Sequence, residues 1–137
     1  MKLITNFLSN MYNHIYDLGV TDTILFSYPE SLDQKATESL TDFIVVEIPY
    51  SMRSLLISND GLVSTYAKIT FFAKDNAYKG SRQADYSKLE TMHSKMAESL
   101  PFITKDFKLT NSNIVIPPKK ASIHFHYMVI NAPLLFK

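Results

Sequence analysis

The residues best suited to chemistry are two histidines, separated by one residue, in a strongly β-type run. His124 and His126 lie in the segment SIHFHYMVI, and alternate residues of a strand point to the same side of it. Two imidazoles on one side can share a metal ion, but a functional site needs at least one further ligand. The candidates for that ligand are His14, His93, Asp106 and Glu47. None of them stands at a recognised spacing, so two hypotheses remain: a metal-dependent enzyme, or histidines that face solvent or a subunit contact.

No other group of residues matches a catalytic pattern. His93 lies on the apolar stripe of a predicted helix, with no Ser or carboxylate placed to form a relay, which indicates a packed core or interface residue. Asp42 and Glu47 are five residues apart in a β-run, so they point to opposite faces and do not form the carboxylate pair of a hydrolase. The three glycines are too widely separated for a phosphate-binding loop or a dinucleotide fingerprint. We therefore assign no catalytic, cofactor-binding or metal-binding residue.

The composition is that of one folded domain covering residues 1–137. Its 137 residues, 46% of them hydrophobic, supply a core that needs no disulfide or metal. The absence of Cys excludes thiol catalysis, thiolate zinc sites and a disulfide framework. A net charge of +1 argues against a protein that holds nucleic acid by bulk electrostatics. No stretch approaches the roughly 18 apolar residues of a membrane span, so no membrane partner is expected.

Two helices are predicted from apolar residues that recur at three- and four-residue steps. The first runs from Leu3 to Leu18 and is followed by Gly19, a residue that commonly ends helices in a left-handed conformation. The second begins near Asp85 and ends at about Leu100, where a proline follows. Ser87 and Glu90 match a capping box at its start.

Six segments carry the β-branched or alternating pattern of strands. The cluster Asn59-Asp60-Gly61 predicts a hairpin, because these residues tolerate positive φ. The order of helices and strands predicts an α+β fold with a mixed, mainly antiparallel sheet and two main helices packed on one face. The predicted strands are Thr23–Tyr28, Asp42–Pro49, Ser54–Ser58, Leu62–Ala73, Phe107–Ile116 and Ser122–Ile130.

Two segments are candidate contact elements. The polar segment 74–84 is predicted to be a flexible loop, whose basic residues and tyrosine can meet phosphate but whose acidic residues favour a solvated loop. The C-terminal tail, residues 131–137, is apolar and interrupted by Pro133, so it either packs back on the core or is covered by a partner. The candidate subunit or partner contacts are Lys74, Tyr78, Lys79, Arg82, Leu134, Leu135 and Phe136.

The predicted elements follow one another in a definite order. An amphipathic N-terminal helix comes first, then strands around FIVVEIP and STYAKITFFA, a second helix, and a closing strand pair ending in SIHFHYMVI. In size and in this order, over nearly the whole chain, the protein resembles the tail terminator and neck-ring (head–tail joining) proteins of tailed bacteriophages. The resemblance implies a structural virion protein, made in the host cytoplasm, that forms a ring of six or more subunits at the neck or tail end. Its partners would be further copies of itself and neighbouring neck or tail proteins, with DNA only as passing cargo.

The resemblance brings no catalytic residues and no cofactor to carry over, and a near-zero net charge suits a conduit that must not grip DNA. Two other classes of function stay open. One is a small cytoplasmic module that binds a ligand or a protein across its sheet, which a deep apolar cleft would favour. The other is the metal-dependent enzyme built on His124 and His126, which bound metal that survives dialysis would favour.

Overall fold

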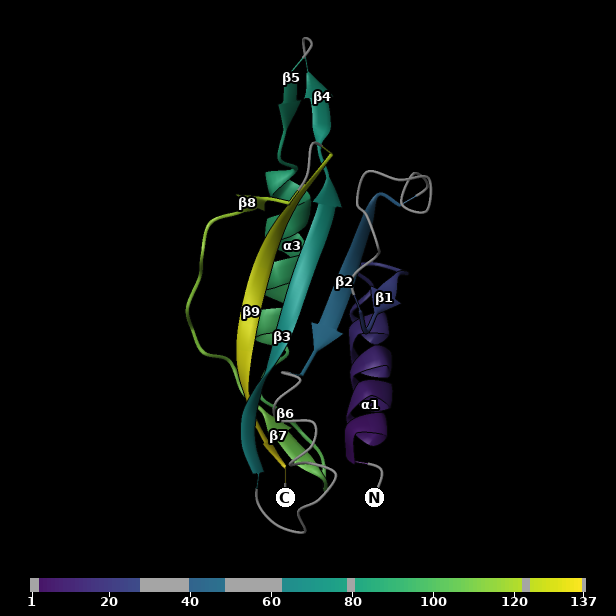
Figure 1. Cartoon of the computed structure of the whole chain (residues 1–137), viewed down its shortest axis with the longest axis vertical. Helices are drawn as coiled ribbons and strands as arrows, with labels where there is room; N and C mark the ends of the chain where they lie inside the picture. Colours follow the sequence, from purple (N-terminus) through teal and green to yellow (C-terminus); the bar gives the residue numbers. More distant parts are fainter. Residues whose placement is uncertain (1–2, 28–39, 49–62, 79–80, 122–123, 137) are drawn as a thin grey trace.

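A computed structural model of the chain describes residues 3–27, 40–48, 63–78, 81–121 and 124–136. Within these ranges, seven strands form one curled sheet. Two helices, α1 (Leu3–Leu18) and α3 (Tyr86–Glu98), pack their apolar stripes into a single core on one face of that sheet (Figure 1). The predicted α+β fold, with a mainly antiparallel sheet and both main helices on one face, is confirmed.

The sheet is built around two long antiparallel strands that pair along their whole length, β3 and β9. The strand order is β1-β2-β3-β9-β7-β6, with β8 also paired to β9, and among the described strands only the β1–β2 pair is parallel. A separate hairpin is formed by β4 (Asn76–Tyr78) and β5 (Ser81–Gln83). The strands of the sheet are β1 (Ile24–Leu25), β2 (Asp42–Glu47), β3 (Val63–Lys74), β6 (Phe102–Ile103), β7 (Phe107–Leu109), β8 (Lys119–Lys120) and β9 (Phe125–Phe136).

Strand predictions hold best where β-branched residues are dense. The observed β2 and β3 match the predicted strands 42–49 and 62–73 closely, whereas the predicted strand 23–28 is reduced to the two residues of β1. The predicted strand 107–116 ends at Leu109, and the predicted strand 122–130 continues to Phe136. The predicted strand 54–58 and the turn 59–61 lie outside the described residues.

Pro133 lies inside β9, where the sequence indicated an interruption. In an antiparallel strand the N–H and C=O of one residue face the same neighbour. The carbonyl of Pro133 accepts a hydrogen bond from the N–H of Thr110 at 2.9 Å, one residue beyond the end of β7. The missing N–H of Pro133 therefore faces the place where the β7 ladder stops, and a proline is tolerated at such a place.

The helix ends follow from local hydrogen bonding. Gly19 has φ of +69° and its N–H donates to the carbonyl of Tyr16 at 3.1 Å, which ends α1 as predicted. At the start of α3 the cap is Asp85, whose carboxylate accepts from the N–H of Lys88 at 3.1 Å. The predicted capping box of Ser87 and Glu90 is wrong, because the helix begins one residue before Ser87.

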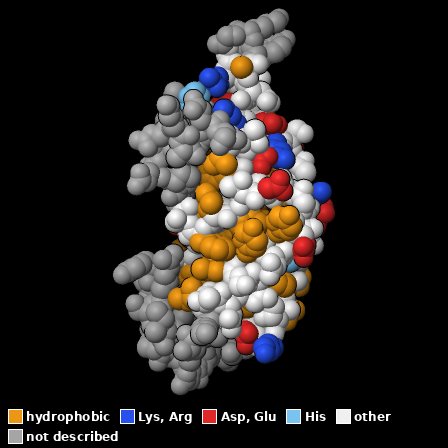
Figure 2. Space-filling model, turned by 90° about the vertical axis from the view of Figure 1, so that its right-hand side faces the viewer, with side chains coloured by type: hydrophobic (Ala, Val, Ile, Leu, Met, Phe, Trp, Pro, Cys, Tyr) orange, Lys and Arg blue, Asp and Glu red, His pale blue; other side chains and the backbone are white. Residues whose placement is uncertain are grey.

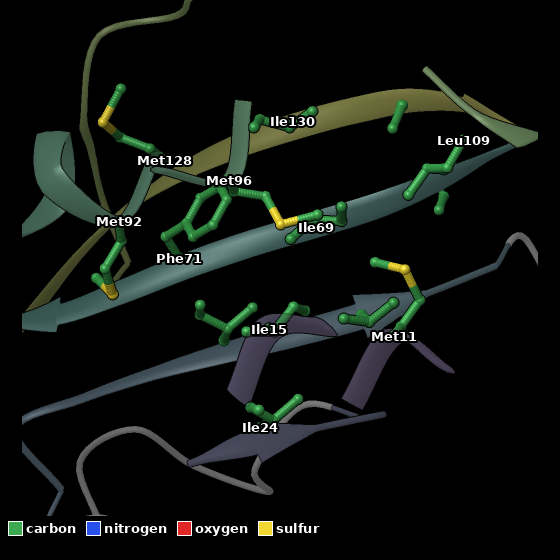
Figure 3. Close-up of a cluster of buried hydrophobic side chains, with 14 of the residues drawn as sticks. Met11, Ile15, Ile24, Ile69, Phe71, Met92, Met96, Leu109, Met128 and Ile130 are labelled. Carbon is green, nitrogen blue, oxygen red and sulfur yellow. The ribbon is translucent and has the colours of Figure 1, made fainter. Parts of the chain in front are cut away.

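The main core lies between the helices and the sheet. In Figure 3, Met96 of α3 lies beside Ile69 and Phe71 of β3, and Met11 of α1 belongs to the same cluster. At the lower end of the molecule the rings of Phe7, Phe107 and Phe136 tie α1, β7 and β9 together, with centroids 5.0 Å apart for the first pair and 5.9 Å for Phe7 and Phe136. The two helices are thus held by the same side chains that close the sheet.

The opposite face of the sheet also carries a buried apolar cluster. Phe43 and Val45 of β2 and Phe72 of β3 pack with Phe125 of β9, and the rings of Phe43 and Phe72 stack 4.6 Å apart. The strand β3 is therefore covered on both sides over this part of its length. No described helix is long and apolar enough to cross a membrane.

Candidate functional site

The segment 74–84 is an antiparallel hairpin in its described part, where we predicted a flexible loop. Backbone pairing joins Asn76 to Gln83 and Tyr78 to Ser81. The two polar strands are therefore stabilised by hydrogen bonds between their backbones rather than by the packing of an apolar face. The hairpin projects from the top of the molecule in Figure 1. Of the candidate contacts here, Arg82 is exposed and Lys74 is half-buried in β3, whereas the side chain of Tyr78 and all of Lys79 lie outside the described part.

The C-terminal tail is the second half of β9. Leu134 and Phe136 are 1% and 0% exposed and belong to the core under the helices. Leu135 is half-buried, and alternation along the strand turns it to the opposite face. Two of the three predicted tail contacts, Leu134 and Phe136, are therefore unavailable to a partner, because the alternating pattern of β9 continues through them.

The base of the hairpin is fixed by a buried carboxylate. Asp75, with a side chain only 2% exposed, lies 2.6 Å from Nδ1 of His126, and its backbone N–H donates to the carbonyl of His124 at 2.7 Å. These two contacts tie the start of β9 to the residue that joins β3 to the hairpin. No group of three or more His, Asp or Glu side chains that could hold a metal ion occurs in the described part of the chain.

The histidines of the helices are packing residues. His93 is buried against the ring of Phe71, and its Nε2 finds no hydrogen-bond partner among the described residues. Burial lowers the pKa of His93 from the ordinary value of 6.5. His14 stacks on Phe102 and shares a 2.8 Å hydrogen bond with the hydroxyl of Ser99, and burial lowers its pKa against the opposing effect of Asp17. His14 therefore fastens α1 to the end of α3.

The two most exposed large apolar side chains of the described residues, Ile114 and Val115, belong to the segment Thr110–Pro118, which we call the arm. We predicted a strand through Ile116, but the arm leaves the sheet after β7 and rejoins it at β8 (left side of Figure 1). Asn113 has φ of +61° and its N–H donates to the side chain of Asn111 at 3.0 Å, so a local turn breaks the strand. Ile114, Val115 and Ile116 are 64%, 68% and 39% exposed.

The outer surface of α1 is a second exposed apolar area. Tyr12 and Tyr16 are 40% and 53% exposed, with rings stacked 6.2 Å apart. Figure 2 shows hydrophobic side chains gathered in the middle of the face on which α1 lies. We did not predict this pair from the sequence, although aromatic residues four positions apart on a helix lie on the same face of it.

The hollows that border the sheet are small or already occupied by paired groups, and another of about 520 Å³ is an open depression over the charged face of α3. A cavity of about 170 Å³ lies between the arm and β9, lined by residues that include Ile116 and Tyr127. One of about 320 Å³ lies beside Thr21, Asp42 and Lys88, but the Asp42 carboxylate is bound both by the Thr21 hydroxyl and by Lys88 Nζ at 3.0 Å. Ligand pockets usually enclose ~300–1,000 Å³ of mostly apolar surface.

No protein-family model, curated protein or solved structure matches the chain. What the protein does must therefore be inferred from its own surfaces.

Proposed function

We propose that this chain is a structural assembly protein whose copies join head to tail in a ring at the neck or tail end of a bacteriophage particle. The observation that carries the proposal is the arm, where three adjacent apolar side chains stand exposed in a segment without strand pairing. Exposed apolar clusters of this kind mark contacts with other proteins. In this proposal the ring is structural. It connects the phage head to the phage tail and leaves a central passage for DNA.

A ring requires two different surfaces on each subunit, since a head-to-tail contact pairs one patch with another. The arm and the outer surface of α1 meet this requirement, because they lie on opposite sides of the molecule (Figure 1). The projecting hairpin β4–β5, with exposed Arg82, is a third element and suits contact with a neighbouring neck or tail protein. The place in the particle is proposed from the resemblance of the order of elements to that of tail terminator and neck-ring proteins.

A binding module is the second candidate function. The hollow of about 320 Å³ beside Asp42 favours it, being large enough for a small ligand. Its central carboxylate is already paired with Lys88 and Thr21, so a ligand would have to break these contacts. We therefore rank it below the ring.

Light scattering of the purified chain, over a range of concentrations and at two salt levels, tests the proposal. We expect a closed species whose mass is a fixed multiple of 15.7 kDa and which forms more readily as concentration rises. A strict monomer at every concentration would contradict the ring and move the binding module to first place. Open polymers of unlimited length would contradict ring closure.

A further inference from the structure

We propose that the arm of one copy of this chain docks on the outer surface of α1 of the next copy. The inference rests on the proposed ring and names its two mating surfaces. On the arm the docking residues are Ile114, Val115 and Ile116, and on α1 they are Tyr12 and Tyr16.

The outer surface of α1 lacks the charges that a solvated helix carries. From Leu3 to Tyr16 the helix has no Asp, Glu, Lys or Arg, and its exposed residues are Thr, Ser, Asn and Tyr. The neighbouring α3 differs, since its outer surface carries Lys88, Glu90, Lys95 and Glu98. Depletion of charge and enrichment in Tyr distinguish the core of a protein interface from ordinary surface. The contrast assigns the interface to α1 rather than to α3.

The arm matches this surface in chemistry. Its sequence TNSNIVIPP contains no charged residue, and Ile114 and Val115 are the two large apolar side chains most open to solvent among the described residues. Burying them against two tyrosine rings removes apolar area from water, which favours association. Exposed asparagines in both segments, such as Asn13 and Asn113, provide polar groups at the edge of the contact.

Charges at the ends of the two segments are complementary. Exposed Asp17 and Asp22 follow the tyrosines of α1, and exposed Lys119 and Lys120 follow the arm. When Ile114–Ile116 lies on the tyrosines with the arm and helix running in the same direction, the lysines approach the aspartates. Charges at an interface rim steer association and fix register more than they add affinity. The occupant of the α1 surface is thus a second copy of this chain.

The two surfaces lie on opposite edges of the molecule, so each subunit can use both at once (Figure 1). A contact between unlike surfaces is heterologous and continues from copy to copy until it closes. A contact of arm with arm, or of α1 with α1, would stop at a dimer. The asymmetry of the proposed contact therefore predicts assembly beyond a dimer, into a ring where the rotation between copies closes.

The absence of Cys makes a direct test possible. Val115→Cys and Tyr16→Cys are combined in one chain, which is oxidised mildly and run on a non-reducing gel. We expect a ladder of disulfide-linked oligomers that collapses to monomer on reduction, because every copy carries both partners of the contact. The matched control combines Val115→Cys with Ser94→Cys on the charged face of α3, and it should give no ladder.

The single variants give the orientation. Val115→Cys alone, or Tyr16→Cys alone, should stay unlinked, and efficient dimer formation by either would overturn the inference in favour of a like-with-like contact. If light scattering shows a ring but the double variant gives no ladder, the docking inference is overturned and the proposed ring still stands. A strict monomer that gives no ladder would overturn both.

Charge reversal supplies a second test. Asp17→Lys should weaken assembly, and combination with Lys119→Asp should restore it, because the two exposed charges then exchange places. Both positions are exposed, so the fold tolerates the changes. Failure of the second change to restore assembly would overturn the proposed register.

Discussion

Truncation of Phe136 tests whether the C-terminal segment belongs to the core. Its side chain is 0% exposed and its ring lies 5.9 Å from that of Phe7 and 6.3 Å from that of Phe107. Phe136→Ala therefore opens a cavity between α1, β7 and β9. Such substitutions typically cost about 3–5 kcal/mol, a large part of the total stability of a small domain.

The adjacent Leu135→Ala is the matched control. Leu135 is half-buried and points to the opposite face, so its truncation should lower the free energy of unfolding by less than half as much. Because the chain has no Trp, urea unfolding is followed by far-UV circular dichroism, at a concentration where the protein is monomeric. A loss for Leu135→Ala equal to or greater than that for Phe136→Ala would refute the register of β9.

Two further predictions concern α3 and the buried histidines. Asp85→Ala should lower the free energy of unfolding by about 1 kcal/mol through loss of the helix cap, whereas Ser87→Ala should change it little. Equal losses for the two variants in urea titrations would contradict Asp85 as the cap and support the capping box of Ser87 and Glu90. The pKa values of His14 and His93 are held below 6.5 in the folded protein. The unfolded chain therefore binds more protons near and below pH 6.5, and the free energy of unfolding falls as the pH drops below 6.5. Above pH 6.5 both histidines are neutral in both states, and this loss of stability is absent. His93→Leu should flatten this dependence, and an unchanged slope between pH 5 and 7 in circular dichroism melts would contradict the assignment to His93.

Helices and inner strands were predictable because their signals are local. The apolar stripe of α1 and the dense β-branched residues of β2 determine those elements almost alone. The alternation of Ile130, Ala132, Leu134 and Phe136 could also have revealed the extension of β9. Pro133 obscured it, since its tolerance depends on where the neighbouring β7 ends.

The candidate contact surfaces were less predictable because they depend on tertiary structure. The sequence of the arm predicts a strand, but the left-handed conformation of Asn113 breaks it. The hairpin β4–β5 has no alternating apolar pattern from which its strands could be predicted. Whether Tyr12 and Tyr16 are exposed depends on which side of α1 the sheet covers. The helices and inner strands were therefore easier to predict from the sequence than the surfaces that we propose as subunit contacts.

Light scattering of mixed interface variants tests the head-to-tail contact most directly. Val115→Lys disables only the arm and Tyr16→Lys disables only the α1 surface, and both positions are exposed. At a concentration where the unmodified chain assembles, we predict that each variant alone is a monomer and that an equimolar mixture forms a dimer of two 15.7 kDa chains and nothing larger. A mixture that stays monomeric, or single variants that assemble like the unmodified chain, would contradict the account.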